Sequence, residues 1–328
     1  MRQANRVTDF PAAGLRAIDP APFRLRLEQL GPLPGHRMGR VVLDRRLRRF
    51  GPRGNVPFAA RLARGLRGGF RWDAEDSRTK DWYPQGIDGR GDVVLVTWYS
   101  KLDGAARLSI ADAGTGRYGH VALVLPDGKP VKTHAGGLAW REDWLYVADT
   151  NKGLRLFDLR RFSGRTLPQA GWYRPTSKDL RFSYASVDDA AGALLIGEYR
   201  DKAAGARLVR WRFAPGGLLA EEEASEAWVT AHPNLQGAAV HDGRMLMARS
   251  RASRREGTLT RSPFEERADK QLWPIGCEDL AIVDGDVVSL TEHPDMVRPL
   301  ARRRTVFRAS ASPPLGSKLP GLAPSGPR

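Results

Sequence analysis

Residues 133–159 read THAGGLAWREDWLYVADTNKGLRLFDL and contain the pattern that decides the fold. A short polar segment and the small residues Gly136 and Gly137 precede a short strand. A turn follows, and two further runs rich in strand-forming residues cover 144–150 and 153–159. Short runs of this kind, separated by turn residues, predict consecutive antiparallel strands.

The same pattern occurs five times along the chain. The five segments begin at Tyr83-Pro84-Gln85-Gly86-Ile87-Asp88, Thr133-His134-Ala135-Gly136-Gly137-Leu138-Ala139, Phe182-Ser183-Tyr184-Ala185-Ser186-Val187, Asn234-Leu235-Gln236-Gly237-Ala238-Ala239-Val240 and Cys277-Glu278-Asp279-Leu280-Ala281-Ile282. Equivalent positions recur at intervals of 42–52 residues: Gly86, Gly137, Ala185, Gly237 and Asp279.

A repeat of this length, made of three or four short antiparallel strands, is typical of a β-propeller blade. Small residues suit the innermost strands, which crowd around the axis. We therefore expect an all-β, five-bladed β-propeller over residues 80–310, closed by an N-terminal strand near residues 23–30. A six-bladed ring would need another blade within 31–79, and unrelated antiparallel sandwiches are the other alternative.

The two ends of the chain differ from the repeats. Residues 1–79 form a basic extension, and apolar residues at every fourth position predict one helix over 57–70. Residues 311–328 are rich in Pro, Ser and Gly and predict a disordered tail.

The charge of the 328-residue chain is +16, and it is concentrated at the ends. Residues 1–70 carry a net charge of +11 and residues 298–328 a net +7, so the middle is nearly neutral. The basic ends are poor in aromatic residues, whereas nucleic-acid-binding surfaces usually combine the two. We therefore expect no nucleic-acid partner.

Other classes of protein are excluded by simple features. No apolar stretch reaches the roughly 20 residues of a transmembrane helix, and no signal peptide precedes the first strand. We expect a monomer that is cytoplasmic or a mature exported form. The single cysteine, Cys277, excludes an intrachain disulfide.

Candidate functional residues lie at the starts of the five inner strands. In a propeller these loops converge at the mouth of the central channel, where a small ligand can bind. Three residues are candidates for proton transfer: Glu278, His134 and Tyr184. Six others are candidates for ligand contact: Asp81, Trp82, Tyr83, Gln85, Asn234 and Gln236.

Glu278 is preferred to its neighbour Asp279, because adjacent side chains on a strand point to opposite faces. The sequence contains no phosphate-binding loop, dinucleotide-binding motif or Gly-x-Ser-x-Gly nucleophile motif. We therefore expect neither a cofactor nor a metal.

The run from Thr133 to Trp140, with the strands at 144–150 and 153–159, resembles a group of uncharacterised bacterial secreted-type β-propeller proteins. Residues 82–86 belong to the same likeness. The resemblance implies the propeller fold and an exported protein, and it brings no established activity.

Three functions fit these observations. The first is an enzyme with cofactor-independent acid–base chemistry on a small molecule or glycan: a hydrolase, lyase, isomerase or cyclase. The second is a non-catalytic, lectin-like propeller that binds such a ligand through the same residues. The third is a scaffold whose basic ends attach to an anionic surface. We favour the enzyme, because an imidazole, a phenol and carboxylates around one cavity suit proton transfer.

Overall fold

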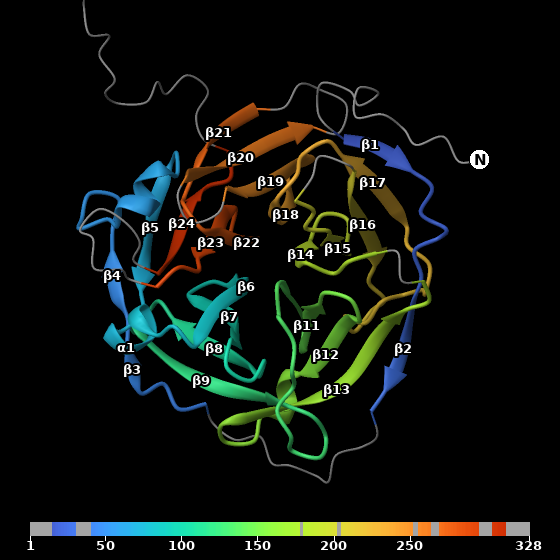
Figure 1. Ribbon diagram of the computed structural model, residues 1–328, viewed down its shortest axis with the longest axis horizontal. Helices are drawn as coiled ribbons and strands as arrows, with labels where there is room; N and C mark the ends of the chain where they lie inside the picture. The colour runs from blue at the N-terminus through green and yellow to red at the C-terminus, as the bar shows by residue number, and fades with distance from the viewer. Residues whose placement is uncertain are drawn as a thin grey trace, which may run out of the picture.

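The computed structural model describes residues 15–30, 41–177, 180–201, 205–251, 255–263, 269–294 and 304–312. Strands dominate these ranges and surround a common centre (Figure 1). The helices of this part of the chain are short: α1 (Ala74–Arg78) and the 3-10 helices η2 (Phe58–Leu62) and η3 (Leu159–Arg161). None of these described helices has the length and apolar character needed to cross a bilayer.

The described strands of the ring belong to four hydrogen-bonded sheets, one of which joins two antiparallel runs of four strands through the parallel pairing of β9 with β13. Antiparallel pairing divides the strands into successive groups of four. The first group is β6 (Trp82–Arg90), β7 (Val93–Ser100), β8 (Ala106–Asp112) and β9 (Arg117–Val124). The second is β10 (Leu138–Arg141), β11 (Trp144–Asp149), β12 (Gly153–Asp158) and β13 (Thr166–Pro175). The third is β14 (Tyr184–Asp188), β15 (Ala193–Gly197), β16 (Ala206–Arg212) and β17 (Glu226–Thr230). The fourth is β18 (Leu235–His241), β19 (Arg244–Arg251), β20 (Arg255–Pro263) and β21 (Asp269–Trp273), and the fifth is β22 (Cys277–Val283), β23 (Asp286–Thr291), β24 (Thr305–Ser310) and β5 (Leu66–Arg71).

The strand named first in each group lies nearest the centre of the ring (Figure 1). These inner strands are β6, β10, β14, β18 and β22, and each contacts the next around the ring. A separate hydrophobic cluster fills each of the five spaces between neighbouring groups. The chain therefore has an all-β propeller fold, with its core divided among the interfaces between groups.

The inner strands approach one another so closely that glycine is required. A Cβ atom added to Gly137 would lie 2.2 Å from the main-chain nitrogen of Ala185 in the next group. A Cβ atom on Gly86 would lie 2.6 Å from the carbonyl carbon of Gly137. This contact between main chains is the physical reason for the small residues at the strand starts.

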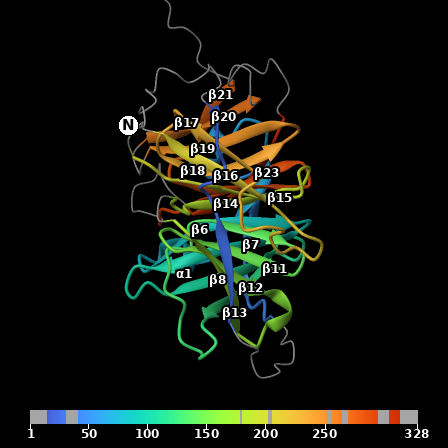
Figure 2. The same ribbon diagram turned by 90° about the vertical axis from the view of Figure 1, so that its right-hand side faces the viewer.

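The N-terminal segment forms an outer belt, which we define as residues 15–30 and 41–71. Its strands β1 (Leu15–Ile18), β2 (Leu25–Gln29) and β3 (Arg45–Arg46) pair with β17, β13 and β9, the outer strands of three groups. The strands β4 (Arg48–Phe50) and β5 complete the edge of the fifth group. In the side view of Figure 2 the blue N-terminal strand crosses the outside of the ring. The belt covers strand edges that would otherwise expose unpaired main-chain groups.

Two predictions about this extension were wrong. The strand near residues 23–30 was expected to close the last blade, but β2 pairs with β13 of the second group, and β5 closes the fifth group. The helix expected over 57–70 ends at Leu62, and Leu66 and Phe70 belong to β5. A spacing of four residues places side chains on one face of a helix and also of a strand, so the pattern could not separate the two. The tail predicted at 311–328 lies outside the described residues beyond Ser312.

Candidate functional site

Three of the inner strands contain a β-bulge near their first residues. The register shifts between Pro84 and Ile87 in β6, between Leu235 and Gly237 in β18, and between Cys277 and Leu280 in β22. A bulge inserts an extra residue and redirects a side chain out of the regular alternation. The residues within these three bulges include Gln85, Gln236 and Glu278.

The three bulge side chains belong to one polar network near the centre of the ring. Gln236 donates its Nε2–H to Oε1 of Glu278 at 3.1 Å, and Gln85 donates its Nε2–H to Oε2 of Glu292 at 3.1 Å. Glu278 and Glu292 are themselves joined by a side-chain hydrogen bond. A hydrogen bond between two carboxyl groups requires that one of them be protonated, and this contact is one of the causes that raise the pKa of Glu278.

Glu278 is the carboxyl group that holds this proton. Its side chain is buried, and burial raises its pKa well above the usual value, with the charges of Glu292 and Asp279 adding to the effect. The hydrogen bond from Gln236 opposes the shift. Burial thus favours the neutral, protonated form of Glu278 over its ionised form.

Glu292, which sequence analysis did not propose, follows directly after β23. The analysis considered only the starts of the inner strands. Because β22 and β23 are antiparallel, the end of β23 lies beside the start of β22. Attention to the last residues of the second strand in each repeat could have identified Glu292.

An aromatic wall adjoins the carboxyl pair. His134 stacks on Tyr99 with 4.3 Å between ring centroids, and Tyr99 in turn contacts Tyr83 at 5.9 Å. The ammonium group of Lys101 lies 3.5 Å from the centre of the Tyr83 ring. This wall brings two predicted residues, His134 and Tyr83, to the same region as Glu292.

The aromatic wall also sets the protonation of its members. Loss of water around the imidazole lowers the pKa of His134, and the charge of Lys101 adds to this although Glu292 opposes it. Burial, followed by the charge of Glu292, raises the pKa of Tyr99 to about 12. An imidazole that favours its neutral form therefore lies close to the carboxyl group of Glu292, and such groups can take part in proton transfer.

A cavity of about 790 Å³ opens beside the network, between the third, fourth and fifth groups. It is lined by Tyr199, Asn234, Gln236, Arg249, Ser250, Arg251, Arg255, Glu292 and His293. Two predicted ligand-contact residues, Asn234 and Gln236, are part of this lining. The volume is within the range of small-molecule sites.

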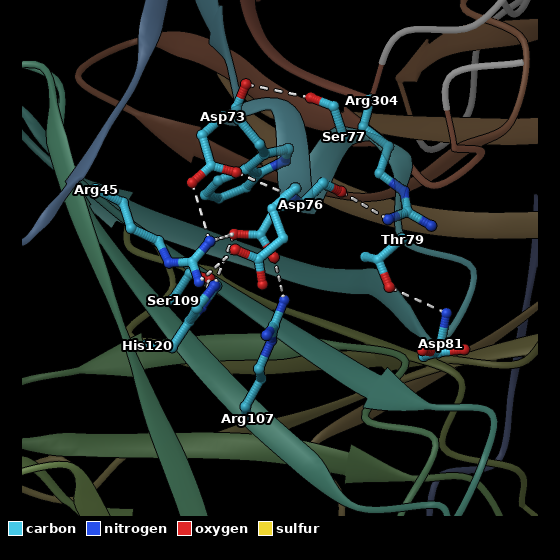
Figure 3. Close-up of polar contacts among 12 residues, drawn as sticks. Arg45, Asp73, Asp76, Ser77, Thr79, Asp81, Arg107, Ser109, His120 and Arg304 are labelled. Atoms are coloured by element: carbon cyan, nitrogen blue, oxygen red, sulfur yellow. Dashed lines mark hydrogen bonds and ion pairs between the residues drawn. The ribbon is translucent and has the colours of Figure 1, made fainter.

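Three predicted site residues lie elsewhere. Tyr184 is fully buried, and its ring packs over Gly197 within a hydrophobic cluster. The strand β14 pairs regularly at this point, so no bulge turns the phenol toward the cavity. Trp82 lies on the opposite face of β6 from Tyr83, with the Arg107 guanidinium 4.4 Å from its ring centre. Asp81 is exposed, and its main-chain N–H is held by the Thr79 hydroxyl (Figure 3).

Asp279, to which Glu278 was preferred, lies among the inner strands. Asp279 is fully buried, and its Oδ2 accepts hydrogen bonds from the main-chain N–H groups of Ile87 and Leu138 at 3.3 and 3.1 Å. The bulge in β22 breaks the alternation, so both carboxyl groups reach other inner strands. Asp279 joins three groups at the centre and has a structural role there.

A second polar cluster, also missed from the sequence, surrounds Asp76 of α1 (Figure 3). Its carboxylate accepts hydrogen bonds from Arg45, Arg107 and Tyr118, and it lies 2.8 Å from Nε2 of His120. Burial alone would raise the pKa of Asp76, but the hydrogen bond and charge of His120, with Arg107 and Tyr118, hold it well below the usual value.

The Asp76 cluster contains the residue types of a catalytic triad, but a substrate cannot reach them. Nδ1 of His120 lies 2.9 Å from the Ser109 hydroxyl. Ser109 is 0% exposed and Asp76 is 2% exposed, so no substrate reaches the hydroxyl. The cluster instead connects the outer belt and α1 to β8 and β9.

Comparisons with known proteins give structural similarity only. No family model matches the chain, and no curated protein matches it. Among solved structures, a glutaminyl cyclase of Myxococcus xanthus has 11% identity and a TM-score of 0.42, over 71% of this chain and 91% of that chain. A GH43_1 enzyme of Xanthomonas citri has 12% identity and a TM-score of 0.45, over 77% of this chain and 91% of that chain. The β-xylosidase RS223 has 11% identity and a TM-score of 0.41, over 70% of this chain and 92% of that chain. At such identities, the site residues of those proteins do not transfer to this chain.

Within the described ranges, no group of three or more His, Cys, Asp or Glu side chains is placed to hold a metal ion. The carboxyl pair and the aromatic wall are therefore considered by their own proton chemistry.

The raised pKa of Glu278 predicts how stability depends on pH. The folded state binds this proton more tightly than the unfolded state, so the contribution is fully present below about pH 4.5 and is lost as pH rises toward the raised pKa. Glu278→Gln removes the titration. We expect the variant to gain stability relative to the parent, by up to about 1.4 kcal/mol per pH unit within this window.

Urea unfolding at several pH values from 5 to 8 measures this difference. Glu221→Gln, which changes an exposed carboxylate, is the matched control and should follow the parent at every pH. Parallel pH profiles for Glu278→Gln and the parent would show that Glu278 is ionised in the folded protein.

Proposed function

We propose that this protein is a five-bladed propeller enzyme that acts on a small molecule or glycan by cofactor-independent acid–base chemistry. The reaction class is a hydrolysis, elimination, isomerisation or cyclisation. The observation that carries the proposal is the pair formed by the buried Glu278 and the half-buried Glu292, which accept hydrogen bonds from amides of two other inner strands beside a cavity. The five groups of four strands and the five interface clusters support the blade number.

A purely structural role accounts poorly for this pair. Burying two carboxyl groups is costly, and well-packed apolar residues stabilise such a place better. Each carboxyl group is nevertheless oriented by its own amide, Glu278 by Gln236 and Glu292 by Gln85. Fixed orientation and a retained proton are what a general acid requires.

The residues take distinct roles in this proposal. Glu278 donates a proton to the substrate and is a catalytic residue, and Glu292, which lines the cavity, is the partner carboxyl group beside it. Neutral His134 accepts a proton on the aromatic side. Gln85 and Gln236 are positioning residues, because they act through the carboxyl groups. Tyr83 and Asn234 contact the ligand.

The alternative is a non-catalytic, lectin-like propeller. The stacked Tyr83, Tyr99 and His134 rings favour this reading, because aromatic faces give large apolar contact area to a ligand. Such a protein binds through the same wall and has no turnover to lose.

Activity measurements on Glu278→Gln and His134→Ala separate the two functions. With a panel of nitrophenyl glycosides and oligosaccharides, we expect the parent to turn over at least one compound. Each variant should then lose about 10²–10⁴ in turnover, the usual effect of removing a proton-transfer group. His134→Ala should keep the parent's melting temperature to within a few degrees, Glu278→Gln should be at least as stable as the parent, and Glu221→Gln should keep full activity. Binding without any turnover by the parent would favour the lectin-like function, and unchanged turnover in both variants would remove their catalytic roles.

A further inference from the structure

The cavity beside the carboxyl pair has one cationic wall. Arg249 and Arg251 come from β19, and Arg255 begins β20, so all three side chains belong to the fourth group. Arg251 and Arg255 are exposed at the rim, whereas Arg249 is half-buried. Glu292 lines the same cavity, so the positive wall lies across from an acidic group.

Arg249 differs from three more deeply buried arginines in its lack of an anionic partner among the described residues. Arg107, Arg155 and Arg207 are bound to the carboxylates of Asp76, Asp149 and Glu198, respectively. Among the described residues, no carboxylate lies within ion-pair distance of Arg249, and its Nε–H is buried without an acceptor. A buried guanidinium N–H without an acceptor is costly, and a bound anion would satisfy it.

The surroundings of Arg249 favour a ligand with negative charge. Burial lowers the pKa of His232 to about 4, and the charges of Lys270 and Arg249 contribute, so this imidazole is neutral near pH 7. The side-chain oxygen of Asn234, another lining residue, is buried without a hydrogen-bond partner. The Nε–H of Arg249 therefore lacks an acceptor, which an anionic group would supply, whereas the Asn234 oxygen lacks a donor, which a hydroxyl group of the same ligand would supply.

We propose that the substrate of this site carries an anionic group, a carboxylate or a phosphate, and that Arg249 binds that group beside Glu292. This inference rests on the proposed function for the chemistry, but anion binding itself requires no turnover. The anionic group is held on the β19 side of the cavity, and the bond to be protonated faces the carboxyl pair. Arg249 is then a specificity residue that selects charged over neutral substrates.

Calorimetric titration at fixed ionic strength tests the inference with three probes: D-glucuronate, inorganic phosphate and D-glucose. We expect the parent to bind at least one of the two anions at least tenfold more tightly than glucose. Arg249→Gln should weaken that binding about 10- to 100-fold, as for the loss of a hydrogen bond to a charged group. Arg249→Lys should retain part of it, because lysine keeps the charge without the two-pronged geometry.

Arg244→Gln is the matched control. Arg244 lies at the other end of the same strand, about 17 Å away along β19, and is exposed. Its removal changes the net charge equally and should leave anion binding as in the parent. Should Arg249→Gln fail to fold, Arg249→Lys carries the comparison alone.

The outcomes separate this inference from the proposed function. Binding of glucuronate alone assigns a carboxylate, and binding of phosphate alone assigns a phosphate. If Arg249→Gln binds both anions as the parent does, or the parent binds neither, the inference is wrong. If Glu278→Gln keeps full turnover while Arg249→Gln still loses anion binding, the anion site stands and the acid–base function is wrong.

Discussion

Gly137→Val is expected to destabilise the protein more than any other single change considered. The added Cβ would lie 2.2 Å from the nitrogen of Ala185 and 2.5 Å from the Cα of Tyr184. Both are main-chain atoms of the neighbouring inner strand, so no side-chain rotation relieves the clash. Overpacking a core usually costs about 1–3 kcal/mol, and this contact between two main chains should cost at least about 3 kcal/mol.

Thermal and urea unfolding of Gly137→Val measure the effect. Gly51→Val is the matched control, because a Cβ atom there meets nothing within 4 Å. It should leave the melting temperature within a few degrees of the parent, as should His134→Ala in the aromatic wall. A melting temperature of Gly137→Val close to that of the parent would mean that the second and third groups are not packed as described.

Asp76→Ala is expected to have the second largest effect on stability. The substitution removes the common acceptor of Arg45, Arg107 and Tyr118 and leaves the largely buried Arg107 without its carboxylate (Figure 3). Removing one partner of a buried ion pair typically costs about 3–5 kcal/mol, because the other charge stays buried and uncompensated. The loss should also loosen the outer belt at β3.

The same helix supplies the control for Asp76→Ala. Glu75 also forms an ion pair with Arg45, at 3.1 Å, but its side chain is 74% exposed. Glu75→Ala should therefore change the unfolding free energy by no more than about 1 kcal/mol, as for surface ion pairs. Equal losses for the two variants in urea unfolding would contradict a special role for the buried carboxylate. Because the pKa of Asp76 is lowered on folding, its contribution is present above about pH 4 and is lost in stronger acid.

The sequence by itself determined the parts of the fold that depend on local pattern. The recurrence of Gly86, Gly137 and their equivalents located the inner strands, because only small residues tolerate the contact between main chains at the centre. Asp242-Gly243 and Asp284-Gly285 connect the first two strands of the fourth and fifth groups, and Asp-Gly pairs of this kind are typical of two-residue hairpin turns. Gln85, Gln236 and Glu278 were identified as related positions because they hold the same place in the repeat.

The tertiary structure decided which of these side chains meet. A bulge shifts the inward–outward alternation of side chains by one residue, and its free-energy cost depends on the neighbouring strands. The direction of the Asp279 side chain therefore could not be predicted from its own strand. The absence of a bulge in β14 left Tyr184 in the core for the same reason. Glu292 joined Glu278 only through the pairing of β22 with β23.

Contacts between distant parts of the chain were the features least predictable from local sequence pattern. Arg45, Asp76, Arg107 and His120 form one cluster although their own segments show no shared motif. Likewise the alternation of side chains in β2 suits pairing with any open strand edge. Its pairing with β13 depends on the path of the outer belt around the ring. Period and small-residue spacing are properties of a segment, whereas strand register, edge choice and charge pairing depend on the free energy of the assembled ring. The repeat could therefore be predicted from the sequence, and the contacts among the site residues could not.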